Sequence, residues 1–138
     1  MNRSDLQRLA ELRLQDAGIL LANGRSEAAY YLAGYTVECA LKACIAKQVR
    51  QYNFPDKRLA IRSFTHDLTD LVDIAGLKAV LTNAVSLSAA LAANWNVVKE
   101  WNETSRYSLA ITQADAQALY TAISDPSTGV LTWLKHHW

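Results

Sequence analysis

The stretch AAYYLAGYTVECALKACIA, residues 28–46, decides the fold of this chain. Its clearly polar side chains are those of Thr36, Glu38 and Lys42. At 3.6 residues per turn the remaining apolar residues cover every side of a helix, and such a helix is packed by several neighbours or by a partner chain. We therefore expect one long central helix over residues 24–52, surrounded by other helices.

Glu38 and Lys42 lie one turn apart on this helix with the acid first, so their side chains can pair along its surface. Taking two charges out of water is costly before pairing offsets it, which suggests a specific role for the pair. That role is either a structural ion pair beside a dimer seam or part of a nucleotide site. We favour the structural role, because no other acidic residue nearby would complete a metal site.

Length and charge describe a single domain over residues 1–138. A chain of 138 residues buries a sizeable core without disulfides or a metal. Fourteen basic and thirteen acidic residues leave a net charge of +1, so no overall field favours nucleic acid or a membrane. The basic residues concentrate between Lys47 and Arg62.

The cysteine pattern and the hydropathy indicate the compartment. Cys39 and Cys44 point in different directions on one helix and cannot bridge each other. No signal peptide pattern follows the polar start of the chain, and no apolar stretch approaches the roughly 20 residues that cross a bilayer. We expect a cytoplasmic protein with reduced thiols and no membrane contact.

Further helices are predicted on both sides of the central one. Ser4 is expected to cap a first helix that ends at Asn23-Gly24, residues 53–64 to form a basic loop, and Thr65 to cap a short helix that ends at Gly76. Later helical segments have inward-facing stripes: Leu77, Val80, Leu81 and Ala84; Leu87, Leu91, Asn94, Val98 and Trp101; Ala116, Leu119 and Ile123 after a cap at Thr112; and Val130, Trp133 and Leu134 after Asp125-Pro126. No strand pattern alternates, so the prediction is an all-α, antiparallel up-and-down bundle of four to five main helices plus short helices.

Several segments resemble a known family. Residues 23–43, NGRSEAAYYLAGYTVECALKA, resemble the signature helix of HEPN domains, and Thr65-His66-Asp67-Leu68 resembles the turn that follows it. Trp101 with Arg106-Tyr107, and the closing GVLTWLK, are similar to a branch of stand-alone prokaryotic HEPN proteins. The resemblance implies a helical bundle that usually dimerises, and for some members a minimal nucleotidyltransferase partner that acts as antitoxin.

Many members of the family are ribonucleases or toxins, which the resemblance alone does not transfer to this chain. Their cleavage motif is an Arg followed by four to six residues and then a His. No His follows Arg106 within reach, and His66 is separated from Arg62 by three residues and from Arg58 by seven. Metal-independent RNA cleavage needs groups that take and give protons near neutral pH, which is usually the work of His. The sequence therefore leans against an enzyme.

The candidate ligand-binding residues are Arg58, Arg62, His66, Asp67, Arg106 and Tyr107. Of these, Arg58, Arg62, His66 and Arg106 are expected to form one basic cleft. His66 stands at a helix start, where free backbone N–H groups can hold a phosphate, and its alternative role is packing and capping. Arg106 either binds an anion or pairs with Glu100 or Glu103, and we favour the pairing. Asn94 interrupts an apolar stripe and is expected to set helix register or a dimer contact.

Three functions remain open. The leading one is a non-catalytic, HEPN-like binding module that needs no metal or other cofactor, forms a homodimer, and binds RNA or nucleotide weakly or acts with a nucleotidyltransferase in a toxin–antitoxin-like system. The second is a divergent metal-independent ribonuclease toxin that uses His66 with Arg62 or Arg106. The third is a plain interaction bundle that dimerises through its apolar helix.

Overall fold

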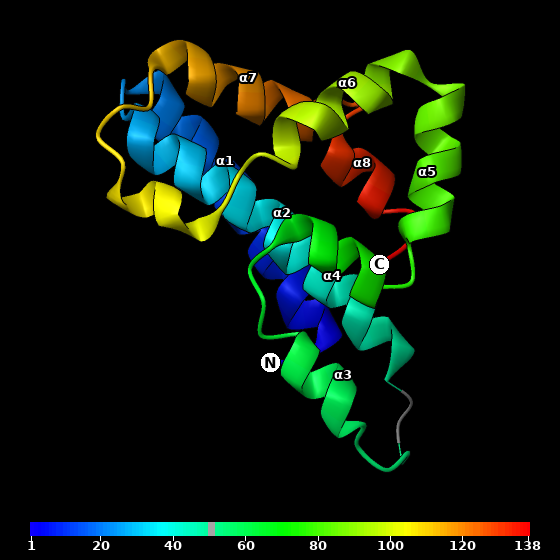
Figure 1. Ribbon diagram of the computed structural model, residues 1–138. Coiled ribbons are helices and arrows are strands. Elements are labelled where there is room, and N and C mark those ends of the chain that lie inside the picture. The colour runs from blue at the N-terminus through cyan, green and yellow to red at the C-terminus, as the bar shows by residue number, and fades with distance from the viewer. Residues whose placement is uncertain (50–51) are drawn as a thin grey trace.

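A computed structural model describes residues 1–49 and 52–138, and the described part contains helices and no strand (Figure 1). The elements are α1 (Arg3–Ala22), α2 (Ser26–Gln48), α3 (Lys57–Arg62), α4 (Leu68–Ile74), α5 (Lys78–Leu87), α6 (Ala89–Val98), the 3₁₀ helix η1 (Glu103–Tyr107), α7 (Gln113–Ser124) and α8 (Val130–Leu134). The all-α prediction is confirmed.

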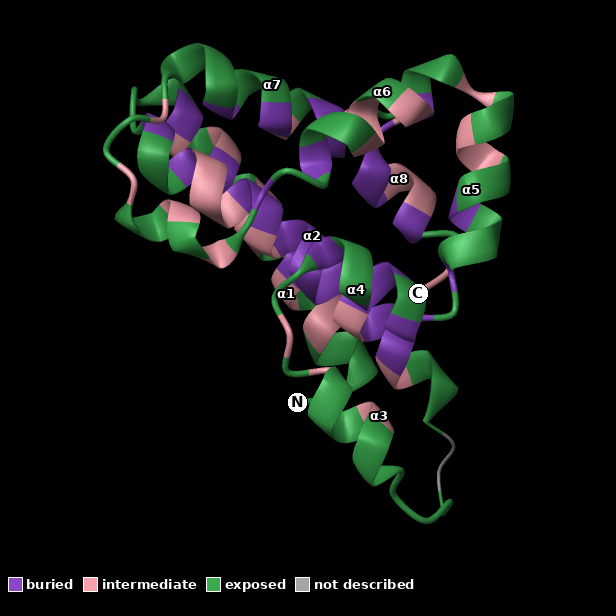
Figure 2. Cartoon of the chain, viewed as in Figure 1, coloured by how far each residue is buried: buried purple, intermediate pink, exposed green. Residues whose placement is uncertain are grey.

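Helix α2 is central, as its apolar sequence predicts. It packs against α1, α4, α7, α8 and η1, and Ala33, Val37 and Leu41 are completely buried along it. Figure 2 shows the middle of α2 mostly in purple, interrupted by a few partly buried residues. The helix is shorter than the predicted range 24–52, because Val49 turns to extended backbone. Residues 50 and 51 of that prediction lie outside the described residues.

The helix caps depend on side chains that the periodicity did not single out. Helix α1 is capped by Asn2 instead of Ser4, since the Asn2 side chain accepts the Asp5 N–H while the Asp5 carboxylate accepts the Asn2 N–H. Gly24 follows α1 in the left-handed conformation, with φ of 73°, as expected of the residue that ends this helix. The predicted cap at Thr112 is confirmed, because its hydroxyl accepts the Asp115 N–H.

Residues 53–64 were predicted as a loop, and the structure shows the short helix α3 within them. The Asp56 carboxylate accepts the N–H groups of Arg58 and Leu59 and so starts this helix. The start of α4 also differs from the prediction: Thr65 accepts the Asp67 N–H in a turn, and Asp67 is the residue that caps α4. Leu68, Leu71, Val72 and Ala75 face inward as expected.

The apolar stripe predicted to run through residues 77–101 is divided at Ser88. This residue ends α5 in extended backbone, and its hydroxyl accepts the Leu91 N–H to begin α6. The break turns Leu87 outward, so that its side chain is 80% exposed, and Val80 is exposed as well. Leu91, Val98 and Trp101 are buried as predicted, although Trp101 lies beyond the end of α6, after a short turn. Helix α8 begins after Gly129 and not at Pro126, because the Asp125 carboxylate holds the intervening turn by accepting the Ser127 and Thr128 N–H groups.

Gly34 allows Trp101 to approach the backbone of α2. A Cβ atom at this glycine would lie 2.2–2.3 Å from atoms of the indole ring, which is far inside van der Waals contact. The contact fixes the segment that leads from α6 into η1 against the middle of α2. It also explains why a glycine stands inside the central helix, where it costs about 1 kcal/mol relative to alanine.

We expect Gly34→Ala to lower the free energy of unfolding by about 2 kcal/mol, because the overpacking penalty exceeds the gain in helix propensity. Urea titration measures the effect. In a Trp101→Leu background, which removes the obstructing ring, the same substitution should cost much less. Equal losses in the two backgrounds would contradict this role of Gly34.

Candidate functional site

One face of α2 is left partly open by the surrounding helices. Tyr31, Tyr35, Glu38 and Lys42 follow one another at intervals of four, three and four residues, so they share a face of the helix. We call these four residues the α2 stripe. The loop before α4 contacts it at Glu38, and the segment containing Trp101 and η1 contacts it at Tyr31.

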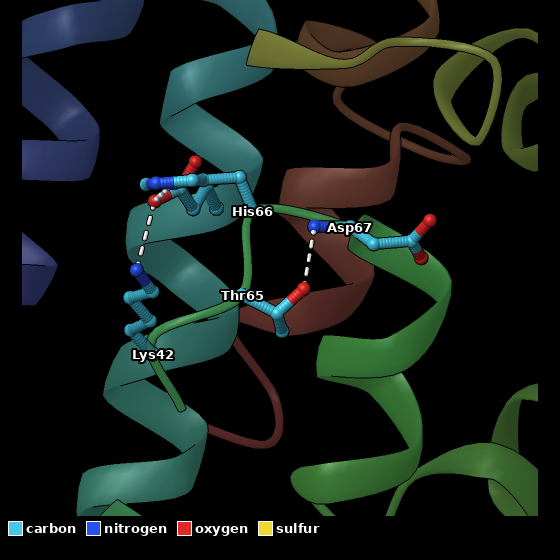
Figure 3. A network of polar contacts seen from close by, with 5 residues as sticks. Lys42, Thr65, His66 and Asp67 are labelled. Carbon is cyan, nitrogen blue, oxygen red and sulfur yellow. Dashed lines mark hydrogen bonds and ion pairs between the residues drawn. The ribbon is translucent and has the colours of Figure 1, made fainter. Parts of the chain in front are cut away.

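The centre of the stripe is the Glu38 carboxylate, whose residue is only 3% exposed. Its Oε1 atom lies 2.9 Å from Lys42 Nζ and 2.9 Å from His66 Nδ1 (Figure 3). The expected Glu38–Lys42 pair is therefore formed, and His66 is a second partner that the spacing did not indicate. A carboxylate in an apolar surrounding needs such partners, since an unpaired charge there would be strongly destabilising.

The contact defines the tautomer of His66. An ionised carboxylate only accepts hydrogen bonds, so Nδ1 must carry the hydrogen and donate it. In the neutral imidazole this leaves Nε2 as the hydrogen-bond acceptor. About half of the His66 side chain, 49%, is exposed to solvent, so the residue remains accessible to a ligand.

Local hydrogen bonds fix the loop that carries His66. Thr65 Oγ1 accepts the Asp67 N–H at 3.1 Å, and Asp67 Oδ1 accepts the Asp70 N–H at 2.9 Å. The fully buried Leu71 and the nearly buried Leu68 hold α4 against the core. Asp67, a candidate ligand-binding residue, is thus engaged as the cap of α4, and the backbone on both sides positions the His66 ring over α2.

The other end of the stripe is formed by two tyrosines. The rings of Tyr31 and Tyr35 are parallel, with their centroids 6.2 Å apart. Burial, together with the neighbouring Cys39 thiol, raises the pKa of Tyr35 to about 12, so its phenol stays protonated. Burial likewise raises the pKa of Cys39 and of Cys44 to about 11, which keeps both thiols protonated and unreactive.

Arg106 and Tyr107 lie beside this tyrosine end. The Arg106 guanidinium carbon is 4.8 Å from the centroid of the Tyr107 ring, and the phenols of Tyr107 and Tyr31 raise the pKa of Arg106. The favoured pairing with Glu100 or Glu103 is wrong: among the described residues, no carboxylate lies within ion-pair distance of Arg106. The guanidinium is turned toward the two phenols instead.

The candidate residues do not form one cleft. Figure 1 shows α3, which carries Arg58 and Arg62, beyond the C-terminal end of α2 and well separated from η1. Arg62 is already paired with Asp73, with 3.3 Å between Nη2 and Oδ2. The structure therefore places His66 and Arg106 along α2 and leaves Arg58 on a separate arm, an arrangement that depends on helix lengths and is invisible to sequence spacing.

Asn94 has a partner within the chain. Its Nδ2 atom donates to the Thr128 carbonyl oxygen at 2.8 Å, which joins α6 to the turn before α8. The arrangement fits the expected role in helix register. No group of three His, Cys, Asp or Glu side chains that could hold a metal ion occurs in the described part of the chain.

These features define a class of protein: a small helical bundle built around one apolar helix, with an ionisable cluster on the open face of that helix. The model of the HEPN domain family matches residues 4–125 of the 138-residue chain. The chain belongs to the HEPN domain family. No curated protein and no solved structure matches it. Within the described residues, no helix is both long and apolar enough to cross a membrane.

The shared oxygen of Glu38 makes its two partners interdependent. Lys42→Met should lower the free energy of unfolding by about 2 kcal/mol, while His66 still satisfies the carboxylate. Combining Lys42→Met with His66→Ala should cost more than the sum of the two single changes, because Glu38 is then buried without a partner. Urea titrations of the four proteins in this cycle measure the coupling.

Adding Glu38→Leu to that double variant provides the control. The triple variant should recover much of the lost stability, since the stranded charge is gone. Strict additivity of the two single changes would show that the carboxylate is solvated and that the proposed coupling does not exist.

Proposed function

We propose that this protein is a cytoplasmic HEPN binding module that forms a homodimer and holds a nucleotide or a segment of RNA without cutting it. In this proposal it acts with a partner such as a nucleotidyltransferase, in the manner of a toxin–antitoxin pair. Family membership and the buried, free cysteines are consistent with the proposal.

The observation that carries the proposal is the state of Arg106. Its charge has no carboxylate partner among the described residues, and it lies beside the 74% exposed ring of Tyr107. A guanidinium binds a phosphate through charge-assisted hydrogen bonds, and an exposed aromatic ring offers a face to a base. Lys42 adds a charged hydrogen-bond donor on the α2 stripe, and His66 beside it presents its Nε2 atom.

Binding without cleavage is favoured because the proton-transfer groups do not come together. Strand cleavage requires one group to take the 2′-hydroxyl proton and another to protonate the leaving oxygen. His66 is held by Glu38, and Arg62, the arginine nearest to it in the sequence, is held by Asp73. Arg106 lies at the tyrosine end of the stripe.

Arg106→Ala should weaken binding of ATP by about tenfold, which corresponds to the loss of one charge-assisted hydrogen bond. Isothermal titration calorimetry measures the change. Arg8→Ala, which removes an exposed arginine of α1, is the matched control and should leave affinity unchanged. Affinity should fall as salt rises, because phosphate contacts release counterions. An equal loss of ATP affinity in both variants would show that only the overall charge of the protein matters, and it would contradict a site at Arg106.

A divergent ribonuclease is the second candidate, and one observation supports it. A buried carboxylate that holds Nδ1–H of a histidine and leaves Nε2 free is also the arrangement that prepares the general base of serine hydrolases. The Glu38–His66 contact has this form. RNA cleavage by the native protein that is lost in both His66→Ala and Glu38→Gln would establish the ribonuclease and overturn the binding module.

The dimer contact is proposed on α5. The apolar residues of α2 are packed mostly by other helices of the same chain, which leaves little apolar surface there for a second copy. Val80, Ala84 and Leu87 share one face of α5, and Val80 and Leu87 are exposed there. An exposed apolar stripe of this kind favours a contact with a second copy.

We expect the protein to sediment as a dimer at micromolar concentration and Leu87→Glu to convert it to a monomer, because a charge in an apolar seam is costly. Leu109→Glu, at an even more exposed leucine in the loop after η1, is the control and should leave the dimer intact. A native protein that sediments only as a monomer at this concentration would end the dimer proposal.

A further inference from the structure

The segment from residue 52 to residue 64 exposes its aromatic side chains almost completely. Phe54 is 97% exposed, Tyr52 95% and Phe64 78%. Figure 2 shows the segment, which includes α3, as a largely exposed projection beyond the end of α2. We call residues 52–64 the α3 arm. A single exposed apolar side chain is normal on a protein surface, whereas several in one place indicate an interaction site.

The arm also lies in the part of the chain where basic residues concentrate. Lys57, Arg58 and Arg62 against Asp56 give it a charge of +2, compared with +1 for the whole protein. The Asp56 carboxylate is engaged by two backbone N–H groups of α3, and Arg62 is paired with Asp73. Lys57 and Arg58 form no ion pair with any described residue.

Exposed aromatic rings and unpaired cations within one short segment are the composition of surfaces that bind single-stranded nucleic acid. Bases stack on the rings at about 1–3 kcal/mol each, and the basic side chains follow the phosphates. The cores of protein–protein interfaces are instead depleted in lysine. A duplex keeps its bases stacked on each other and has no free faces to offer these rings. A single strand is therefore the ligand that the charges and the rings both favour.

We propose that the α3 arm binds single-stranded RNA, with bases stacked on Phe54 and Phe64 and the backbone held by Lys57 and Arg58. The inference rests on the proposed function, which it extends from a nucleotide to a strand. The arm is joined directly to the His66 loop, since Phe64 stands two residues before His66. A strand that leaves the arm thus reaches the α2 stripe.

The length of α2 sets the length of strand that engages both places. Tyr31, beside Arg106, and Gln48, at the end of α2 next to the arm, are 17 residues apart, which is about 26 Å along a helix. A strand that rises 3.4 Å per nucleotide covers that distance with about eight nucleotides. ATP reaches the Arg106 end alone, whereas a strand of about twelve nucleotides reaches the arm as well.

The test compares these two probes. Fluorescence anisotropy with a labelled single-stranded RNA of about twelve nucleotides should show at least a tenfold loss of affinity for the double variant Phe54→Leu/Phe64→Leu, because leucine keeps the apolar surface but cannot stack. Phe54→Tyr/Phe64→Tyr should bind as the native protein does. Ile19→Ala, at an exposed apolar residue of α1, is the control for general surface changes. The duplex of the same sequence should bind more weakly than the single strand.

Each result separates the two proposals. Loss of RNA affinity in the leucine variant with unchanged ATP affinity supports the arm as a strand-binding site. If RNA binding needs the arm but Arg106→Ala has no effect on ATP, the arm stands and the proposed nucleotide site fails. Unchanged RNA affinity in the leucine variant, or equal affinity for the duplex, overturns the arm proposal whatever ATP does. A leucine variant that alters sedimentation and not RNA affinity assigns the arm to protein contact and also overturns it.

Discussion

The structure depends on accommodating one buried carboxylate, that of Glu38, on the central apolar helix. Glu38 is almost completely buried in α2, and a charge in that position is tolerated only when it is paired and hydrogen-bonded. Lys42 supplies one partner from the same helix and His66 the other from the loop before α4. Because His66 is 28 residues from Glu38, satisfying this carboxylate also fixes where the chain returns to α2 after α3.

The same constraint shapes the open face of the molecule. The side of α2 that carries Glu38 is covered incompletely, since its two hydrogen-bond partners, Lys42 and His66, are themselves partly exposed. At the other end of the stripe, Trp101 packs against Gly34 and brings η1, with Arg106 and Tyr107, alongside Tyr31. The pairing of a buried charge and a close aromatic contact thus place basic and aromatic side chains along one helix.

Local chemistry accounts for most of the differences between the expected and the observed helices. Asp56 begins α3 inside a segment that looked like a loop, and Ser88 divides a stripe that looked continuous. In each case a side-chain oxygen accepts a backbone N–H, and this capping hydrogen bond decides the helix boundary against the hydrophobic pattern. The division at Ser88 has the larger consequence, because Leu87, the last residue of α5, is left exposed beside it.

The sequence by itself determined the all-α class, the central position of α2, the Glu38–Lys42 pair and the family, because helical period, residue spacing within one helix and motif order are all local properties of the chain. It did not determine that His66 joins Glu38, that Arg106 is turned to tyrosines and not to glutamates, or that Arg58 and Arg106 lie apart. Those facts depend on the lengths and packing of helices distant in sequence, and a buried charge selects its partners from whatever the folded chain brings within hydrogen-bond distance.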